Sequence, residues 1–317
     1  MRLITYAEKS SGKAGAGFLL GDGSTIVPAR ELGLPEDMNE LIRALGESAA
    51  AEGKAAALTA SAAFASLKDK LAAAGKDASK ASDRPVLGQN ASLLAPIPHP
   101  AQDVVCLGVN YRKHAVETRN NAFIDDVDAT KNYAIYFAKR VWEAVPPDGA
   151  IDGHTDICDS LDYEAELCVV IGADAKNVSE EEAPGYILGY TILNDMSARN
   201  LQNRHKQWYF GKSLDDFTPI GPCIVTADEF EMPPARAIRS RVNGELRQDD
   251  ITDNLIHSIS EVVSELSRGF TLRAGTLIAM GTPSGVGMGF NPPKYLKPGD
   301  VIECEIDGIG VLKNTVR

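Results

Sequence analysis

The stretch that most constrains this chain is residues 161–172, Leu-Asp-Tyr-Glu-Ala-Glu-Leu-Cys-Val-Val-Ile-Gly. Its second half is short, apolar and β-prone, and it ends at Gly172, which predicts a strand entering a core. Because side chains alternate across a strand, Glu164 and Glu166 point to one face, roughly 6–7 Å apart along the backbone. Two carboxylates this close to a core need a positive charge between them, and a divalent cation is the simplest candidate. An edge strand with both glutamates in solvent is the alternative.

A third carboxylate follows a second apolar run. Residues 189–193, Gly-Tyr-Thr-Ile-Leu, predict another buried strand, which ends in the polar cluster Asn-Asp-Met-Ser-Ala-Arg at 194–199. Polar clusters at the ends of buried strands are places where sites are built on a rigid scaffold. We therefore expect Asp195 to join Glu164 and Glu166 in a three-carboxylate site suited to Mg²⁺. The alternative role for Asp195 is to cap a helix.

Four motifs follow one another along the chain. They are Asp-Tyr-Glu-Ala-Glu-Leu at 162–167, Gly-Tyr-Thr-Ile-Leu-Asn-Asp-Met-Ser-Ala-Arg-Asn-Leu-Gln at 189–202, Phe-Gly-Lys-Ser at 210–213 and Gly-Thr-Pro at 281–283. In this order, over roughly residues 100–317, they resemble the fumarylacetoacetate hydrolase family, and spaced motifs in order are far more specific than one motif alone. The resemblance implies a mixed β-roll core, usually in a homodimer. It also implies a metal-dependent enzyme acting on β-dicarbonyl or 2-oxo acids.

The N-terminal part of the chain differs in pattern from the rest. Residues 1–28 predict a small β-meander, and residues 36–82, rich in Ala, Lys, Glu and Ser, predict helices. The proline-rich segment 95–100 is a stiff linker and a natural boundary. We therefore expect an α+β fold, with a small α/β domain at 1–98 and a catalytic domain with the mixed β-roll at 99–317.

Bulk properties exclude several classes of function. The chain has 317 residues, of which 44% are hydrophobic and 24% charged, as in ordinary globular proteins. A formal charge of −12 argues against nucleic-acid or anionic-membrane partners. The five cysteines are scattered without Cys-x-x-Cys spacing, which favours a reducing compartment and neither zinc nor disulfide scaffolding. No signal peptide is visible and no apolar run approaches about 18 residues, so we expect a cytoplasmic protein that does not span a membrane.

A candidate catalytic base follows the strand predicted at 104–108. His114 and Glu117 are three residues apart, so a helical turn places them on one face within hydrogen-bonding reach. A carboxylate that holds an imidazole fixes its tautomer, as a water-activating base requires, whereas the alternative is a surface histidine near a glutamate. The resemblance implies that His114 is the general base with Glu117 as its partner. The polar residues 118–132 that follow predict a mobile lid.

Further side chains complete the expected site. The resemblance implies that Gln202 contacts substrate and that Arg199 is mostly structural. Lys212, which follows an aromatic cluster, can hold a substrate carboxylate or an enolate oxygen; a surface lysine lying over the aromatic residues is the alternative. Tyr111 and Thr282 are the other expected substrate-binding residues.

The C-terminal third predicts regular elements around a glycine-rich loop. Asn243-Gly244 predicts a type I′ hairpin, residues 255–267 predict a helix with Gly269 as its C-cap, and residues 301–316 predict a final hairpin. We expect the backbone N–H groups of the loop 281–289 to bind the carboxylate of the substrate. Prolines follow this loop where a helix would be needed, so it does not fit a dinucleotide site.

These features together predict a hydrolase that cleaves a carbon–carbon bond in a 2,4-dioxo acid, such as an acylpyruvate or a fumarylacetoacetate-like compound. Some family members carry an Asp as a fourth metal ligand, but residues 108–110 offer no carboxylate. Glu164, Glu166 and Asp195 would therefore hold Mg²⁺, or Mn²⁺ or Ca²⁺ in its place, with water or substrate in the remaining positions. His114 would activate water and Lys212 would stabilise the released enolate. The alternatives are a decarboxylase, isomerase or hydratase of a 2-oxo acid and, less favoured, a non-catalytic metal-binding protein.

Overall fold

A large mixed sheet forms the centre of the molecule. The computed structural model describes residues 1–52, 55–77, 79–119, 133–205 and 207–317. In the ten-stranded sheet the strands follow the order β3-β2-β1-β12-β10-β9-β15-β5-β6, with β4 paired to β1. In chain order they are β1 (Arg2–Glu8), β2 (Ala14–Leu19), β3 (Ile26–Pro28), β4 (Ala91–Leu93), β5 (Val104–Gly108), β6 (Ile135–Lys139), β9 (Ala165–Ile171), β10 (Ile187–Asn194), β12 (Ile220–Thr226) and β15 (Leu277–Ala279).

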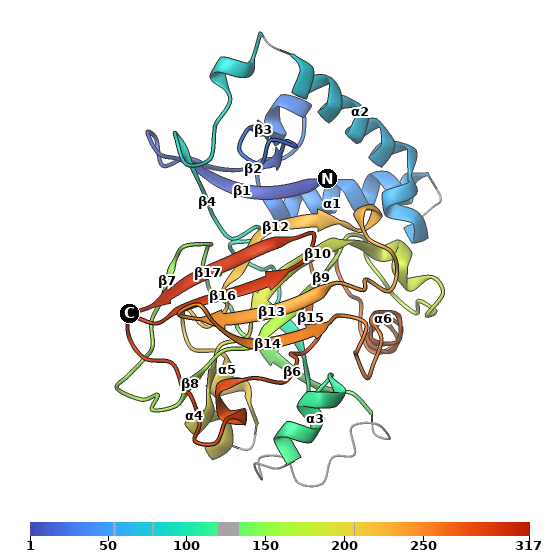
Figure 1. Cartoon of the computed structure of the whole chain (residues 1–317). Coiled ribbons are helices and arrows are strands. Elements are labelled where there is room, and N and C mark those ends of the chain that lie inside the picture. The colour runs from blue at the N-terminus through green and yellow to red at the C-terminus, as the bar shows by residue number, and fades with distance from the viewer. Residues whose placement is uncertain (53–54, 78, 120–132, 206) are drawn as a thin grey trace.

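The strands at the N-terminus continue the sheet that carries the site. β1 pairs antiparallel with β12, with Arg2 opposite Val225. Helices α1 (Met38–Ala51) and α2 (Ala62–Lys76) lie at this end of the molecule (Figure 1), and Asp37 and Ser61 cap them through the backbone N–H groups of Glu40 and Phe64. The strands and helices thus lie within the ranges predicted for them, but Gly46 and Gly75, glycines at which breaks would be expected, lie inside α1 and α2. The domain boundary at residue 98 stays a prediction, because the strands before and after it share one sheet.

A second sheet packs against the first. Its strand order is β14-β13-β16-β17-β7. Strands β13 and β16 contact β9 of the first sheet, β16 and β17 contact β10, and β17 also contacts β12. Most pairs in both sheets are antiparallel, but β15 with β5 and β17 with β7 are parallel, so the expected mixed, sheet-rich architecture is confirmed. The strands are β7 (Ala150–Ile151), β13 (Ala237–Val242), β14 (Glu245–Ile251), β16 (Val301–Ile306) and β17 (Gly310–Val316).

Short elements gather at the end of the molecule away from α1 and α2 (Figure 1). They are α3 (Arg112–Arg119), α4 (Arg199–Arg204), α5 (Tyr209–Lys212) and the paired strands β8 (Leu161–Asp162) and β11 (Ser197–Ala198). The first two residues of the segment predicted as a lid belong to α3, and its remaining residues, 120–132, lie outside the described residues. This end of the sheets carries the candidate site.

The predicted C-terminal hairpins and helix are present, and the helix differs from the prediction at both of its ends. The β13–β14 hairpin turns at Asn243 and Gly244, whose φ angles of 51° and 81° confirm the type I′ signal. Helix α6 (Ile259–Gly269) begins after Ser258, whose hydroxyl accepts the Glu261 N–H. It stops at Gly269 as predicted, but Gly269 is its last helical residue, and the C-cap is Phe270 in an extended conformation.

The structure also bears on the predictions about the cysteines and about membrane-spanning segments. All five cysteines are buried and free, in agreement with the absence of a disulfide framework. Across the described part of the chain, no helix has both the length and the apolar character needed to cross a membrane.

Candidate active site

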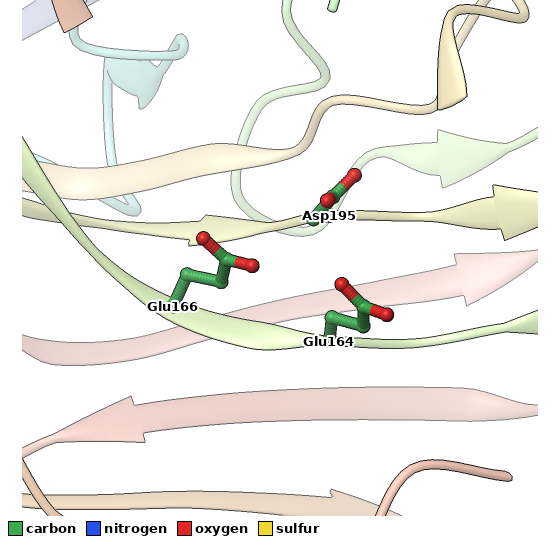
Figure 2. A group of neighbouring side chains, drawn as sticks. All are labelled: Glu164, Glu166 and Asp195. Atoms are coloured by element: carbon green, nitrogen blue, oxygen red, sulfur yellow. The ribbon is translucent and has the colours of Figure 1, made fainter. Parts of the chain in front are cut away.

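Strand pairing brings the three predicted metal ligands together. Glu166 lies in β9 and Glu164 just before it, while Asp195 directly follows β10, the antiparallel neighbour of β9. The backbone N–H of Asp195 donates to the carbonyl oxygen of Glu164 at 2.8 Å. The three carboxylates converge (Figure 2), with one oxygen from each within 4.8 Å of the others. All three residues are buried.

Cationic side chains surround these acids. The Lys212 ammonium lies between Glu164 and Asp195, at 2.9 and 2.8 Å from one oxygen of each. Lys139, at the end of β6, contacts the second Asp195 oxygen at 2.6 Å. Arg199 contacts Glu164 at 2.6 Å and Asp162 at 2.9 Å, in the structural role expected of it.

Charge balance in this cluster leaves Glu166 as the unmatched acid. Four buried carboxylates meet three buried cations: the acids are Asp162, Glu164, Glu166 and Asp195, and the cations are Lys139, Arg199 and Lys212. Burial, together with the negative charges of Asp195 and Glu164, raises the pKa of Glu166 well above its usual value. Burial also disfavours the charged form of Glu164, but Lys212 and Arg199 outweigh it and lower the pKa of that carboxyl group.

The residues present fit a divalent cation. One oxygen of Glu166 accepts the Gly281 N–H at 2.8 Å, while the other, Oε1, is buried and has no hydrogen-bond partner among the described residues. A buried, unpaired carboxylate oxygen facing two further carboxylates matches the oxygen-rich donor set of Mg²⁺ or Mn²⁺. Within the described ranges, these three residues are the group found with metal-ligand geometry, and residues 108–110 add no fourth carboxylate.

The predicted base and its partner are in contact. Nδ1 of His114 lies 2.8 Å from Oε2 of Glu117, one turn further along α3. The other Glu117 oxygen accepts the backbone N–H of Gly285 at 2.9 Å. An ionised carboxylate only accepts hydrogen bonds, so this contact places the imidazole hydrogen on Nδ1 and leaves Nε2 free to take a proton.

The glycine-rich loop has a different role from the one expected of its N–H groups. Gly281 donates to Glu166 and Gly285 to Glu117, while Gly287 and Met288 donate to the two oxygens of Asp162 at 2.6 and 3.0 Å. These N–H groups bind carboxylates of the protein itself, where we expected them to bind the substrate. The loop therefore fixes Glu166, a candidate metal ligand, Glu117, the partner of the candidate base His114, and Asp162, which anchors Arg199.

One pocket brings most of the predicted residues together. Its lining includes polar side chains of both the acidic cluster and the base, with an apolar wall. The polar members are His114, Thr118, Glu164, Arg199, Gln202, Asn203, Lys212 and Thr282, and the wall includes Leu107, Val109, Phe137, Trp208 and Met288.

Of the three substrate-binding residues expected from sequence, two line the pocket and one does not. Gln202 lines the pocket and accepts a hydrogen bond from Arg199 at 3.0 Å. Thr282 also lines it, but its hydroxyl donates to the Ala165 carbonyl and accepts from the Gln248 amide. Tyr111 is fully buried, is absent from the pocket lining, and its hydroxyl has no hydrogen-bond partner among the described residues. The substrate contacts of all three stay predictions.

Sequence reasoning missed two buried residues that support the site. Lys139 is the last residue of β6, and a lysine that ends an apolar run is itself a signal of a buried partner. Gln248 in β14 accepts the Ala165 N–H at 3.1 Å and donates to Thr282 at 2.7 Å and to the Pro283 carbonyl at 2.8 Å. It therefore joins β9 to the loop 281–289. No sequence pattern marked Gln248.

Comparison with known proteins agrees with this fold. The model of the fumarylacetoacetate (FAA) hydrolase C-terminal family matches residues 103–317. The chain is 44% identical over 224 residues to the oxaloacetate tautomerase YisK of Bacillus subtilis (strain 168), covering 71% of this chain and 72% of the relative. The chain therefore belongs to the fumarylacetoacetate hydrolase family.

Two solved structures show how far the likeness extends. A fumarylacetoacetate hydrolase of Exiguobacterium antarcticum has a TM-score of 0.77 at 33% identity, covering 100% of this chain and 99% of that one. A 2-hydroxyhepta-2,4-diene-1,7-dioate isomerase of Mycobacterium marinum has a TM-score of 0.65 at 27% identity, covering 100% and 98%. The scaffold is thus that of a family whose named members include hydrolases, isomerases and a tautomerase.

Proposed function

We propose that this protein is a metal-dependent enzyme that interconverts the keto and enol forms of a small 2-oxo dicarboxylic acid, with oxaloacetate as the first substrate to test. The observation that carries the proposal is that His114, held by Glu117, lines the same pocket as Glu164, one of the three clustered carboxylates. The name of the Bacillus subtilis relative supports it. This proposal replaces carbon–carbon hydrolysis, which the comparisons do not confirm, with an isomerisation on the same scaffold.

The residues of the chain have distinct roles in this reaction. Glu164, Glu166 and Asp195 would hold a divalent cation, which when bound supplies Lewis-acid polarisation of the 2-oxo group. Nε2 of His114 takes a proton from C3 of the keto acid, and the electrons of that C–H bond form the C2=C3 double bond. The 2-oxo oxygen gains the proton and becomes the enol hydroxyl. Glu117 holds the imidazole and stabilises its protonated form.

Lys212 acts as a fixed positive charge in the proposed site. Burial lowers its pKa, but Asp195 and Glu164 outweigh burial and raise the pKa above the usual lysine value. Lys212 therefore stays an ammonium at neutral pH and does not serve as the base. It stabilises the negative charge that develops on the substrate as C3 loses its proton.

Hydrolysis of a 2,4-dioxo acid is the second candidate function. It is favoured by the full-length likeness to the Exiguobacterium antarcticum hydrolase. In that reaction His114 takes a proton from water and the resulting hydroxide attacks the distal carbonyl. The C–C bond then breaks with its electron pair going to the pyruvate fragment, and this enolate takes the proton from His114 to give pyruvate beside the carboxylic acid. The two candidates differ in whether His114 acts on carbon or on water.

A pair of assays separates the candidates. Enol oxaloacetate is mixed with enzyme and Mg²⁺ or Mn²⁺, and loss of enol absorbance is compared with the uncatalysed rate. Acylpyruvates are assayed in parallel for pyruvate by coupling to lactate dehydrogenase. The proposal predicts accelerated enol loss without pyruvate, abolished by His114→Asn. An enol decay equal to the uncatalysed rate would reject the tautomerase, and pyruvate formed from an acylpyruvate would establish the hydrolase.

A further inference from the structure

The glycine-rich loop and helix α3 meet where Gly289 faces Glu117. A Cβ atom added to Gly289 would lie 2.0 Å from Oε1 and 2.3 Å from Cδ of Glu117, and its three nearest heavy atoms would all belong to that side chain. The φ angle of Gly289 is outside the left-handed region, so its backbone would accept alanine. The requirement for glycine here is one of space, and Glu117 occupies that space.

The loop is itself held by residues beside the metal ligands. The Tyr163 hydroxyl donates to the Gly285 carbonyl at 2.9 Å, and the Gly287 N–H donates to Asp162 at 2.6 Å. Tyr163 directly precedes Glu164, and both Tyr163 and Asp162 are fully buried. The contacts thus run from Asp162 and Tyr163, next to Glu164, through the loop 281–289 to Glu117 and His114.

We propose that Gly289 is a positioning residue for the His114–Glu117 pair. Its missing side chain leaves the space in which the Glu117 carboxylate is held against both the Gly285 N–H and Nδ1 of His114. The catalytic consequence rests on the proposed function, in which His114 is the base. An alanine at 289 would push the carboxylate out of this space and release the imidazole from its fixed tautomer.

The test combines a spectroscopic and a kinetic measurement on the full chain. In Gly289→Ala, we expect the hydrogen-bonded Nδ1–H resonance of His114 to be lost, as in Glu117→Ala, with His114→Asn used for assignment. For oxaloacetate, kcat should fall by about the factor seen in Glu117→Ala while KM stays unchanged. The matched control is Gly269→Ala, at a position with no heavy atom within 4 Å of the added Cβ and no positive φ, which should change neither measurement.

A double variant separates positioning from a general structural fault. In the Glu117→Ala background the space is vacant, so adding Gly289→Ala should change kcat by less than about twofold, a non-additive result that signals direct coupling. If Gly289→Ala alone melts too low to measure, recovery of the melting temperature in the double variant supports the proposal. Equal instability of both would overturn it.

The resonance measurement also keeps this inference apart from the proposed function. An unchanged His114 Nδ1–H resonance in Gly289→Ala would overturn the positioning role, whatever the activity. A wild-type protein without tautomerase activity would overturn the proposed function, while loss of the resonance in Gly289→Ala would still establish how the imidazole is held.

Discussion

Replacing Glu166 with glutamine should have opposite effects on stability with and without metal. Glu166 is 1% exposed and one of its oxygens lacks a partner among the described residues, while Asp195 and Glu164 add negative charge beside it. Gln keeps the shape and the acceptor for Gly281, and its amide donates toward the neighbouring carboxylates. Without metal we therefore expect Glu166→Gln to be more stable than wild type near pH 7.5.

The pH dependence of this difference has a defined sign. Burial and the neighbouring acids raise the pKa of Glu166 in the folded state, so between its ordinary value and the raised value the folded protein holds a proton that the unfolded chain has lost. The free energy of unfolding of metal-free wild type therefore falls as pH rises through this window, by up to about 1.4 kcal/mol per pH unit. Glu166→Gln lacks this titrating group. The free energy of unfolding of the variant should therefore increase relative to that of wild type as pH rises from about 4.5.

The magnitudes are large enough to measure. An unsatisfied buried polar group costs about 1–3 kcal/mol, and more when it is charged. At about 2.1 cal/mol/K per residue, a chain of 317 residues has an unfolding entropy near 0.7 kcal/mol/K, so 1–3 kcal/mol corresponds to about 1.5–4.5 °C in Tm. Metal at about 1,000 times its Kd stabilises wild type by about 4.1 kcal/mol, or about 6 °C, which exceeds the advantage of the variant. The order of the two melting temperatures should therefore invert when metal is added.

The assay is thermal melting of both proteins in chelator and in saturating Mg²⁺ or Mn²⁺ between pH 5 and 8. The control is Glu143→Gln, which changes an exposed glutamate and should follow wild type throughout. A variant less stable than wild type in chelator across the whole pH range would refute the assignment of Glu166 as the unmatched acid. An equal response to metal in both proteins would remove the metal site.

The remaining predictions concern catalysis, buried pairing and assembly. His114→Ala should lower turnover by roughly 10²-fold or more, the usual size of general-base effects, while melting curves still respond to metal; full activity would mean that the base lies elsewhere. Glu117→Gln should lower turnover by a smaller factor than His114→Ala in the same assay, because it weakens the hold on the imidazole without removing the imidazole. Lys139→Met should destabilise the metal-free protein by about 3–5 kcal/mol in urea titration, because it leaves one oxygen of the buried Asp195 without its ion pair at 2.6 Å. The protein should run as a homodimer in light scattering coupled to size-exclusion chromatography, and a monomer would contradict this.

The parts of the fold that follow from local signals could be predicted from sequence. The β9 and β10 strands are continuous apolar runs, and Asn243-Gly244 demands a tight hairpin, so both predictions needed only neighbouring residues. The pairing of β1 with β12 joins Arg2 to Val225, and no local signal reports a contact over that distance. Helix α6 starts at Ile259, later than predicted, because Leu255 is engaged in a bridge with Tyr111 and Ser258 provides the cap.

The loop 281–289 shows why donors were easier to predict than their partners. The sequence indicated a set of free backbone N–H groups beside the site, and that part was right. Their acceptors are Asp162 and Glu166, from the stretch 161–172, and Glu117 from α3; these two segments meet the loop only in the folded chain. A buried carboxylate of the protein needs hydrogen-bond donors as much as the carboxylate of a substrate does. The N–H groups of the loop are therefore engaged by acids of the protein itself.

The cations of the site follow from the same requirement. Once Glu164, Glu166 and Asp195 are placed in a core, buried positive charge must accompany them, because isolated charges are not tolerated there. The chain supplies it from Lys139 at the end of an apolar strand, from Arg199 just after Asp195, and from Lys212 behind an aromatic cluster. Three cations and four acids leave one negative charge without a counter-charge. We assign it to Glu166, because its Oε1 atom has no hydrogen-bond partner among the described residues. The deficit therefore couples metal binding to the release of the proton that Glu166 holds in the metal-free protein, so the affinity for Mg²⁺ should rise with pH until that proton is lost.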